Sequence, residues 1–143
     1  MNSSFSRRAF LEGAAATVGA ALIAGCGSGS SQTPQAKESG QGYTLANTQL
    51  PPNGEAIAFT FPNGKAGLLY RSKEGQSGAV SAVCTHQGCT VEWTDGNPQA
   101  AFSCPCHQSK FDLQGKQLGG PAKAPLAHYA ATQNNTDIEL KLL

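Results

Sequence analysis

The chain is poor in charged and aromatic residues and contains no long hydrophobic run. Lysine, arginine, aspartate and glutamate make up 13% of its 143 residues, and the formal net charge is +1. Nucleic-acid binding normally requires a strongly basic face, so this composition argues against a nucleic-acid partner. Aromatic residues make up only 7% of the chain. A small, aliphatic core is therefore expected, which covalent or metal cross-links would help to stabilise.

Two common cysteine motifs are also missing. The chain has no C-x-x-C-H motif, which excludes a c-type haem attachment site, and no C-x-x-C pair, which disfavours a thioredoxin-like dithiol. Its five cysteines fall instead in two short boxes and at one isolated position, Cys26. The first box reads C-T-H-Q-G-C over residues 84–89, and the second reads C-P-C-H-Q-S over residues 104–109. Each box therefore combines two cysteines with one histidine.

Two cysteines and two histidines suit two kinds of metal centre. A tetrahedral zinc ion accepts such a ligand set. A two-iron, two-sulfur cluster does so as well when histidines replace two cysteines on one iron. Zinc leaves the additional cysteine of each box unexplained, along with Ser109. The sequence therefore favours the iron–sulfur cluster, with zinc as the alternative.

The two boxes resemble those of the high-potential, disulfide-bearing Rieske iron–sulfur proteins, closely over about residues 79–126. The resemblance implies one [2Fe–2S] cluster with four protein ligands. They would be Cys84 and Cys104 on one iron, and His86 and His107 on the other. It also implies a disulfide between Cys89 and Cys106 that joins the two loops. The segment Gly119–Pro125 is similar to the family's third, proline-rich loop over the cluster.

The same resemblance identifies residues that would tune the cluster. Ser109 matches a family serine that donates to a bridging sulfide, whereas Phe111 stands where respiratory members have a tyrosine that donates to a ligand sulfur. Such hydrogen bonds raise the reduction potential. Gln87 and Gln108 replace a leucine and a glycine of the respiratory members. A more polar docking surface around the histidines is therefore expected.

The N-terminus is predicted to be a targeting segment. Ser6–Leu11 matches the twin-arginine export pattern, and an apolar run of about 13 residues follows, too short for a confident membrane span of ~20. Small residues before Cys26 resemble a lipobox, which would make Cys26 a lipid anchor. An uncleaved anchor and an ordinary cleaved signal remain the alternatives. We thus expect a signal over residues 1–25, a flexible Gly/Ser-rich tether over 26–42 and a Rieske domain over 43–143.

The segment after the tether has the pattern of an all-β domain, with short strands separated by turns and no convincing helix. About nine strands are expected. The clearest are Glu55–Phe61, Ala66–Arg71, Ala79–Val83, Val91–Trp93, Ala100–Phe102, Lys110–Asp112, Ala127–Thr132 and Asp137–Leu142. Together with the resemblance, this predicts a Rieske-type antiparallel β-sandwich or barrel with a small cluster-binding subdomain of loops. The remaining histidine, His128, is interpreted as an ordinary, partly exposed residue.

The expected function is one-electron transfer on the extracytoplasmic side of a membrane, with a cytochrome or a membrane complex as partner. Two alternatives share this chemistry: a quinol-oxidising subunit of a cytochrome bc-type complex, and the small subunit of a molybdenum oxidase such as arsenite oxidase. A Rieske oxygenase is disfavoured, because it needs a second, mononuclear iron domain. Apart from the ligand histidines, the sequence shows no general acid or base and no independent catalytic site.

Overall fold

The computed structural model describes residues 32–94 and 99–143, which form eleven strands and no helix. Seven antiparallel strands build the larger sheet, in the order β1-β2-β11-β10-β5-β4-β3. Their bounds are Ala36–Ser39 (β1), Gly42–Leu45 (β2), Glu55–Thr60 (β3), Ala66–Arg71 (β4), Ser77–Ser81 (β5), His128–Asn134 (β10) and Asp137–Leu142 (β11). The smaller sheet has the order β6-β7-β8-β9, with Glu92–Trp93 (β6), Phe102–Cys104 (β7), Ser109–Phe111 (β8) and Gln117–Gly119 (β9). The predicted all-β class is confirmed.

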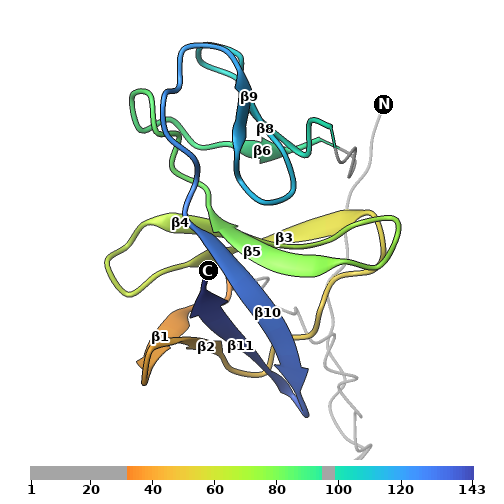
Figure 1. The fold of residues 1–143 in the computed structure, drawn as a ribbon. Helices are drawn as coiled ribbons and strands as arrows, with labels where there is room; N and C mark the ends of the chain where they lie inside the picture. Colours follow the sequence, from red (N-terminus) through yellow and green to blue (C-terminus); the bar gives the residue numbers. More distant parts are fainter. Residues whose placement is uncertain (1–31, 95–98) are drawn as a thin grey trace, which may run out of the picture. The chain divides into compact units, whose positions relative to one another are not determined.

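The larger sheet closes on itself. Gln35, just before β1, forms a parallel bridge with Thr60 at the end of β3, and the Thr60 N–H donates to the Pro34 carbonyl at 2.9 Å. The two outer strands of the sheet are thereby joined, so the seven strands form a barrel without long free edges. Figure 1 shows the smaller sheet on one side of this barrel, beyond β4 and β5.

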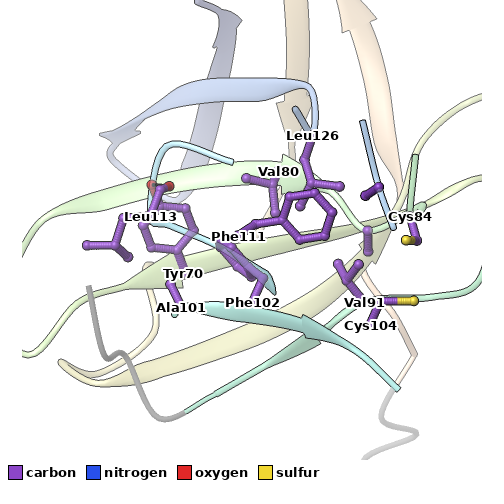
Figure 2. Close-up of a cluster of buried hydrophobic side chains, with 12 residues drawn as sticks. Tyr70, Val80, Cys84, Val91, Ala101, Phe102, Cys104, Phe111, Leu113 and Leu126 are labelled. Atoms are coloured by element: carbon purple, nitrogen blue, oxygen red, sulfur yellow. Dashed lines mark hydrogen bonds between the residues drawn. The ribbon is translucent and has the colours of Figure 1, made fainter. Parts of the chain in front are cut away.

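Strands β4 and β5 separate two hydrophobic cores. Side chains alternate between the two faces of a strand, and here both faces are covered. Leu69 and Ala79 point into the barrel core, while Tyr70 and Val80 belong to a second core beneath the smaller sheet. Figure 2 shows this second core, which also contains the cluster-box cysteines Cys84 and Cys104. The metal-binding boxes are therefore supported from below by packed apolar side chains.

One prediction about the chain's organisation is corrected. Residues 36–42 were assigned to a flexible tether, yet β1 lies within them and pairs with β2 from Ala36 opposite Leu45. A short polar strand with a single buried residue shows little hydrophobic alternation in its sequence, and Ala36 is the only buried residue of β1. The loops of the predicted cluster-binding subdomain are mounted on the four-stranded sheet. The predicted signal and residues 95–98, between β6 and β7, lie outside the described residues.

Candidate metal centre

Each cysteine–histidine box forms a compact turn at the end of a strand. The first box follows β5, where the Cys84 N–H donates to the Cys89 carbonyl at 2.7 Å and the Gly88 N–H donates to the Cys84 carbonyl at 2.9 Å. The second box joins β7 to β8, and the Gln108 N–H donates to the Cys104 carbonyl at 2.9 Å. These bonds fix both turns from within. The first cysteine of each box points into the core and its histidine lies nearer the surface.

The four predicted ligands come together in pairs. Cys84 and Cys104 carry free thiols that are 2% and 1% exposed. His86 is half-buried and His107 is exposed, and their ring centroids lie 4.7 Å apart with planes at 86°. The boxes thus supply two buried thiols and two adjacent imidazoles, a mixed sulfur and nitrogen donor set of the kind that a histidine-ligated iron–sulfur cluster requires.

The thiols are placed where a metal would ionise them. Burial raises the pKa of the Cys104 thiol, and its hydrogen-bonding neighbour Cys84 adds to this effect. Without a nearby cation, an isolated buried thiolate would be costly at this position. Bound iron supplies the missing positive charge, because a coordinating thiol is deprotonated.

A buried nitrogen without a partner supports the same interpretation. The Nδ1 atom of His86 is buried and makes no hydrogen bond within the described residues. Buried polar atoms in native structures nearly always have a partner, so an exception requires an explanation such as an ion. A metal bonded to Nδ1 would satisfy this atom. The residues present thus fit a [2Fe–2S] cluster.

The predicted disulfide between Cys89 and Cys106 is confirmed, with an S–S distance of 2.11 Å. It links the two boxes, which are 17 residues apart in sequence at these positions. The sulfur of Cys104 lies within 4.8 Å of both disulfide sulfurs. This trio is not a separate metal site, because a disulfide sulfur is not a thiolate ligand. The bridge instead holds the two boxes together directly beside Cys104, one of the predicted ligands.

The proline-rich segment covers the boxes and contacts both of them. The Ala122 N–H donates to the fully buried Ser109 Oγ at 3.1 Å, and the Thr85 hydroxyl donates to the Ala124 carbonyl at 2.6 Å. Gly120 packs so closely that an added Cβ would lie 2.5 Å from Ser109 Cα. The sequence did not predict the contact between Thr85 and Ala124, because the two residues are 39 positions apart in the chain.

The structure also places the predicted tuning residues. Ser109 Oγ accepts from Ala122, and its own proton has no acceptor among the described residues. That proton would be available to a bridging sulfide, as the resemblance implies. Phe111 is fully buried in the same core as Cys84 and Cys104 and carries no hydroxyl. One of the two hydrogen bonds expected from the resemblance is thus missing.

A hydrogen-bonded pair that the sequence did not reveal lies between the barrel and the small sheet. The buried Tyr70 hydroxyl is 2.7 Å from the Leu113 carbonyl and 3.0 Å from His128 Nε2. The hydroxyl has one proton, which it donates to the carbonyl, so His128 donates from Nε2. Burial, followed by the negative charge of Asp112, raises the pKa of Tyr70 to about 12. His128 is half-buried as expected, but it is part of a network rather than an ordinary surface residue.

The N-terminal predictions concern residues that the structure does not describe. Cys26 and the twin-arginine pattern precede residue 32, where the described residues begin. No helix in residues 32–94 or 99–143 is long and apolar enough to span a membrane. Export and lipidation therefore stay predictions from the sequence.

A closed antiparallel barrel that carries a small sheet with two disulfide-linked cysteine–histidine loops defines an iron–sulfur protein of the histidine-ligated class. Residues 42–130 match the family model of the Rieske [2Fe–2S] domain. This chain belongs to that family, and its cofactor is one [2Fe–2S] cluster. The recognition from the two boxes is thereby confirmed.

Named relatives share this domain. The cytochrome b6-f complex iron–sulfur subunit of Chlorobaculum thiosulfatiphilum is 40% identical over 88 residues, which cover 62% of this chain and 46% of that protein. The corresponding subunit of Prochlorococcus marinus (strain NATL1A) is 36% identical over 109 residues, covering 66% of this chain and 60% of that protein. The chain therefore spans about half the length of these curated relatives.

Solved structures show the same fold. The plasma membrane Rieske protein PetC3 from Synechocystis PCC 6803 aligns with a TM-score of 0.51 at 34% identity, covering 60% of this chain and 85% of that one. The ferredoxin of carbazole 1,9a-dioxygenase from Nocardioides aromaticivorans IC177 gives a TM-score of 0.56 at 20% identity, covering 68% of this chain and 96% of that one. The second likeness concerns the fold alone.

Proposed function

We propose that this chain is a one-electron carrier in which Cys84 and Cys104 hold one iron and His86 and His107 hold the other. The observation that carries the ligand assignment is the buried, unpartnered Nδ1 of His86 beside the ring of His107. The cluster supplies reversible one-electron chemistry when bound. The protein's own contribution is to bury the thiols, hold the loops with the Cys89–Cys106 disulfide and leave the His107 edge exposed to a partner.

Protein-film voltammetry of the purified holoprotein tests this function. The wild type should give a reversible one-electron wave, and Cys104→Ser should abolish it together with the cluster's visible absorption. Ser103→Ala is the matched control, because Ser103 precedes Cys104 in β7 and is not a ligand. A wild type that binds one zinc ion and shows no wave would contradict the proposal.

A quinol-oxidising role in a membrane complex is the second candidate. It is supported by the similarity to iron–sulfur subunits of cytochrome b6-f complexes. A tagged chain purified in mild detergent from its native membranes would then retain a b-type cytochrome, visible in the haem absorption spectrum. Purification of membrane-extracted chain without any haem would favour a stand-alone carrier.

We further propose export by the twin-arginine route and a lipid anchor on Cys26, which together place the domain at the extracytoplasmic membrane surface. The support is the Ser6–Leu11 pattern and the small residues before Cys26. Mass spectrometry of membrane-extracted protein should find acyl chains on Cys26, and Cys26→Ala should stop processing. Mature protein that still contains Arg7 and Arg8 would contradict the lipid anchor and favour an uncleaved one.

A further inference from the structure

Three of the four box cysteines bring their sulfur atoms together. The sulfurs of Cys89, Cys104 and Cys106 lie within 4.8 Å of one another. Cys89 and Cys106 form the disulfide, and Cys104 carries a free thiol that is 1% exposed. A thiolate that reaches a disulfide sulfur can displace one of the two partners and take its place. The trio therefore has all the components of a thiol–disulfide exchange within one molecule.

The fold itself holds these sulfurs close to one another. In the first box the Cys84 N–H donates to the Cys89 carbonyl at 2.7 Å, and in the second the Gln108 N–H donates to the Cys104 carbonyl at 2.9 Å. Cys104 also lies in β7, paired with Ser109 of β8. Reactants that are held in place react far faster than the same groups in free solution. The thiol and the disulfide are thus positioned by backbone contacts that do not involve iron.

Burial decides which disulfide sulfur is attacked. Cys89 is half-buried and packs against the core that contains Cys104, whereas Cys106 is exposed. Attack on Cys89 expels Cys106 into water, where its thiolate is solvated, and a thiol of lower pKa leaves faster. Attack on Cys106 would expel a half-buried thiolate and close a bridge across Pro105, whose ring fixes φ. The favoured product is therefore a bridge between Cys89 and Cys104.

The second free thiol, Cys84, is placed differently. Figure 2 shows its sulfur at the same end of the core as that of Cys104. It is not a member of the group whose sulfurs all lie within 4.8 Å of one another. A disulfide between Cys84 and Cys104 would also remove two electrons and would need an oxidant, whereas exchange needs none. Cys104 is thus the thiol that is placed to react with the existing bridge.

We propose that in the iron-free protein Cys104 exchanges into the disulfide, which forms a Cys89–Cys104 bridge and frees Cys106. The inference rests on the proposed role of Cys104 as an iron ligand. The Cys104 thiolate bonds to Cys89 Sγ, the Cys89–Cys106 bond breaks, and its electron pair leaves with Cys106 Sγ, which takes up a proton. The product lacks one cluster ligand. A bound cluster would hold the Cys104 sulfur and prevent the attack, so cluster and native disulfide protect each other.

Thiol mapping after removal of the cluster tests this proposal. Holoprotein is acidified under argon, which stops exchange by protonating thiols. Hydrogen sulfide is purged and iron is removed with a chelator, because residual sulfide would itself attack the disulfide. The protein is returned to neutral pH without oxygen and alkylated at intervals from minutes to hours, the range of uncatalysed disulfide rearrangement. Proteolysis after Glu92 and Lys110 separates the two boxes, and fragment mass spectra locate the label.

In the two boxes the label should start on the two free thiols, Cys84 and Cys104. With time it should leave Cys104 and appear in equal amount on Cys106, while Cys84 stays labelled. Holoprotein kept at neutral pH for the same period should retain the Cys89–Cys106 bridge. A native bridge that persists in the iron-free protein would overturn the proposal, as would a Cys104–Cys106 bridge. Bridges that include Cys84 would overturn it too, because they would show exchange in an unfolded chain.

Cys84→Ser and Cys104→Ser form a matched pair of variants, because each lacks one predicted ligand and keeps one buried thiol. Cys84→Ser should carry the Cys89–Cys104 bridge and a free Cys106, whereas Cys104→Ser should keep the Cys89–Cys106 bridge. The same Cys89–Cys106 bridge in both variants would overturn the proposal. Wild-type protein that shows the one-electron wave, yet keeps its native bridge after iron removal, would refute only this inference. Absence of the wave in the starting protein would refute the proposed function.

Discussion

At the scale of single residues, Phe111 is expected to lower the cluster potential, because it lacks the hydroxyl that the resemblance places at this position. A hydrogen bond to a charged group contributes about 1.5–3 kcal/mol, and we take ~1 kcal/mol as the difference between the redox states. For one electron, about 59 mV corresponds to about 1.4 kcal/mol. Phe111→Tyr should therefore raise the potential by roughly 40 mV. Ser109→Ala should lower it, because the hydroxyl that the resemblance assigns as a donor to a bridging sulfide is lost.

Protein-film voltammetry at fixed pH measures both shifts. The EPR spectrum of each variant shows whether the cluster is intact. An unchanged potential in Phe111→Tyr, with the cluster present, would mean that the Phe111 ring does not approach a ligand sulfur. The hydrogen-bond argument would then fail.

His128 makes stability depend on pH. Burial lowers the pKa of His128, and the negative charge of Asp112 offsets part of this effect. The folded protein therefore binds this proton less readily than the unfolded chain. The stabilisation is complete above the unfolded pKa of about 6.5 and is lost as pH falls through the lower, folded value. Urea unfolding midpoints of the wild type should fall over this interval more steeply than those of His128→Gln. Parallel pH profiles would contradict the assignment.

At the scale of elements, the third loop depends on Gly120. Its φ is +81°, and an added Cβ would meet the backbone of Ser109 at 2.5 Å. Gly64 has a similar φ of +78° with nothing within 4 Å of an added Cβ, so it serves as the control. Gly64→Ala should cost about 1 kcal/mol from the backbone conformation alone. Gly120→Ala should cost about 1–3 kcal/mol more and reduce cluster content.

Iron analysis and chemical unfolding of the two variants test this prediction. The comparison isolates the close approach of the loop, because the backbone strain is nearly the same in both. Equal losses of stability would show that the loop can move away from Ser109 without cost.

The sequence predicted the elements with strong alternation and turn residues. The ranges Ala66–Arg71 and Asp137–Leu142 agree with β4 and β11. It missed β1, β2 and β9, which are short and mostly polar or half-buried, and whose pairing depends on distant strands. For the same reason the start of the domain was placed too late. Local strand propensity and hydrophobic periodicity carry no information about the long-range strand pairing that closes the barrel.

The metal centre was more predictable than the sheet that supports it. Its ligands and disulfide lie within two boxes of six residues, so their chemistry is visible locally. The contacts that hold the boxes in place are not local. Thr85 contacts a residue 39 positions away, and Tyr70 contacts His128 at a separation of 58. Nothing in the sequence near these residues indicates their partners.

At the scale of the whole molecule, Tyr70 joins the barrel to the cluster-binding sheet. Its ring stacks on Trp93 with centroids 5.5 Å apart, and its hydroxyl donates to Leu113 across the second core. Tyr70→Phe leaves that carbonyl without its donor and should cost about 1–3 kcal/mol of unfolding free energy. Tyr43→Phe is the control, because the Tyr43 hydroxyl makes no hydrogen bond within the described residues and should cost less than about 0.5 kcal/mol.

Denaturant unfolding followed by circular dichroism measures both losses. Cluster absorption recorded in the same samples shows whether the two halves of the molecule unfold together. Similar stabilities of Tyr70→Phe and Tyr43→Phe would contradict the role assigned to this hydrogen bond.

The central claim is that two cysteines and two histidines of the boxes hold one [2Fe–2S] cluster. Pulsed EPR of the reduced protein, labelled with ¹⁵N at histidine, tests it most directly. The account predicts coupling to two histidine nitrogens, with the cluster lost in His86→Ala and retained in His128→Gln. A cluster signal without histidine coupling, or protein that contains stoichiometric zinc and no acid-labile sulfide, would contradict the account.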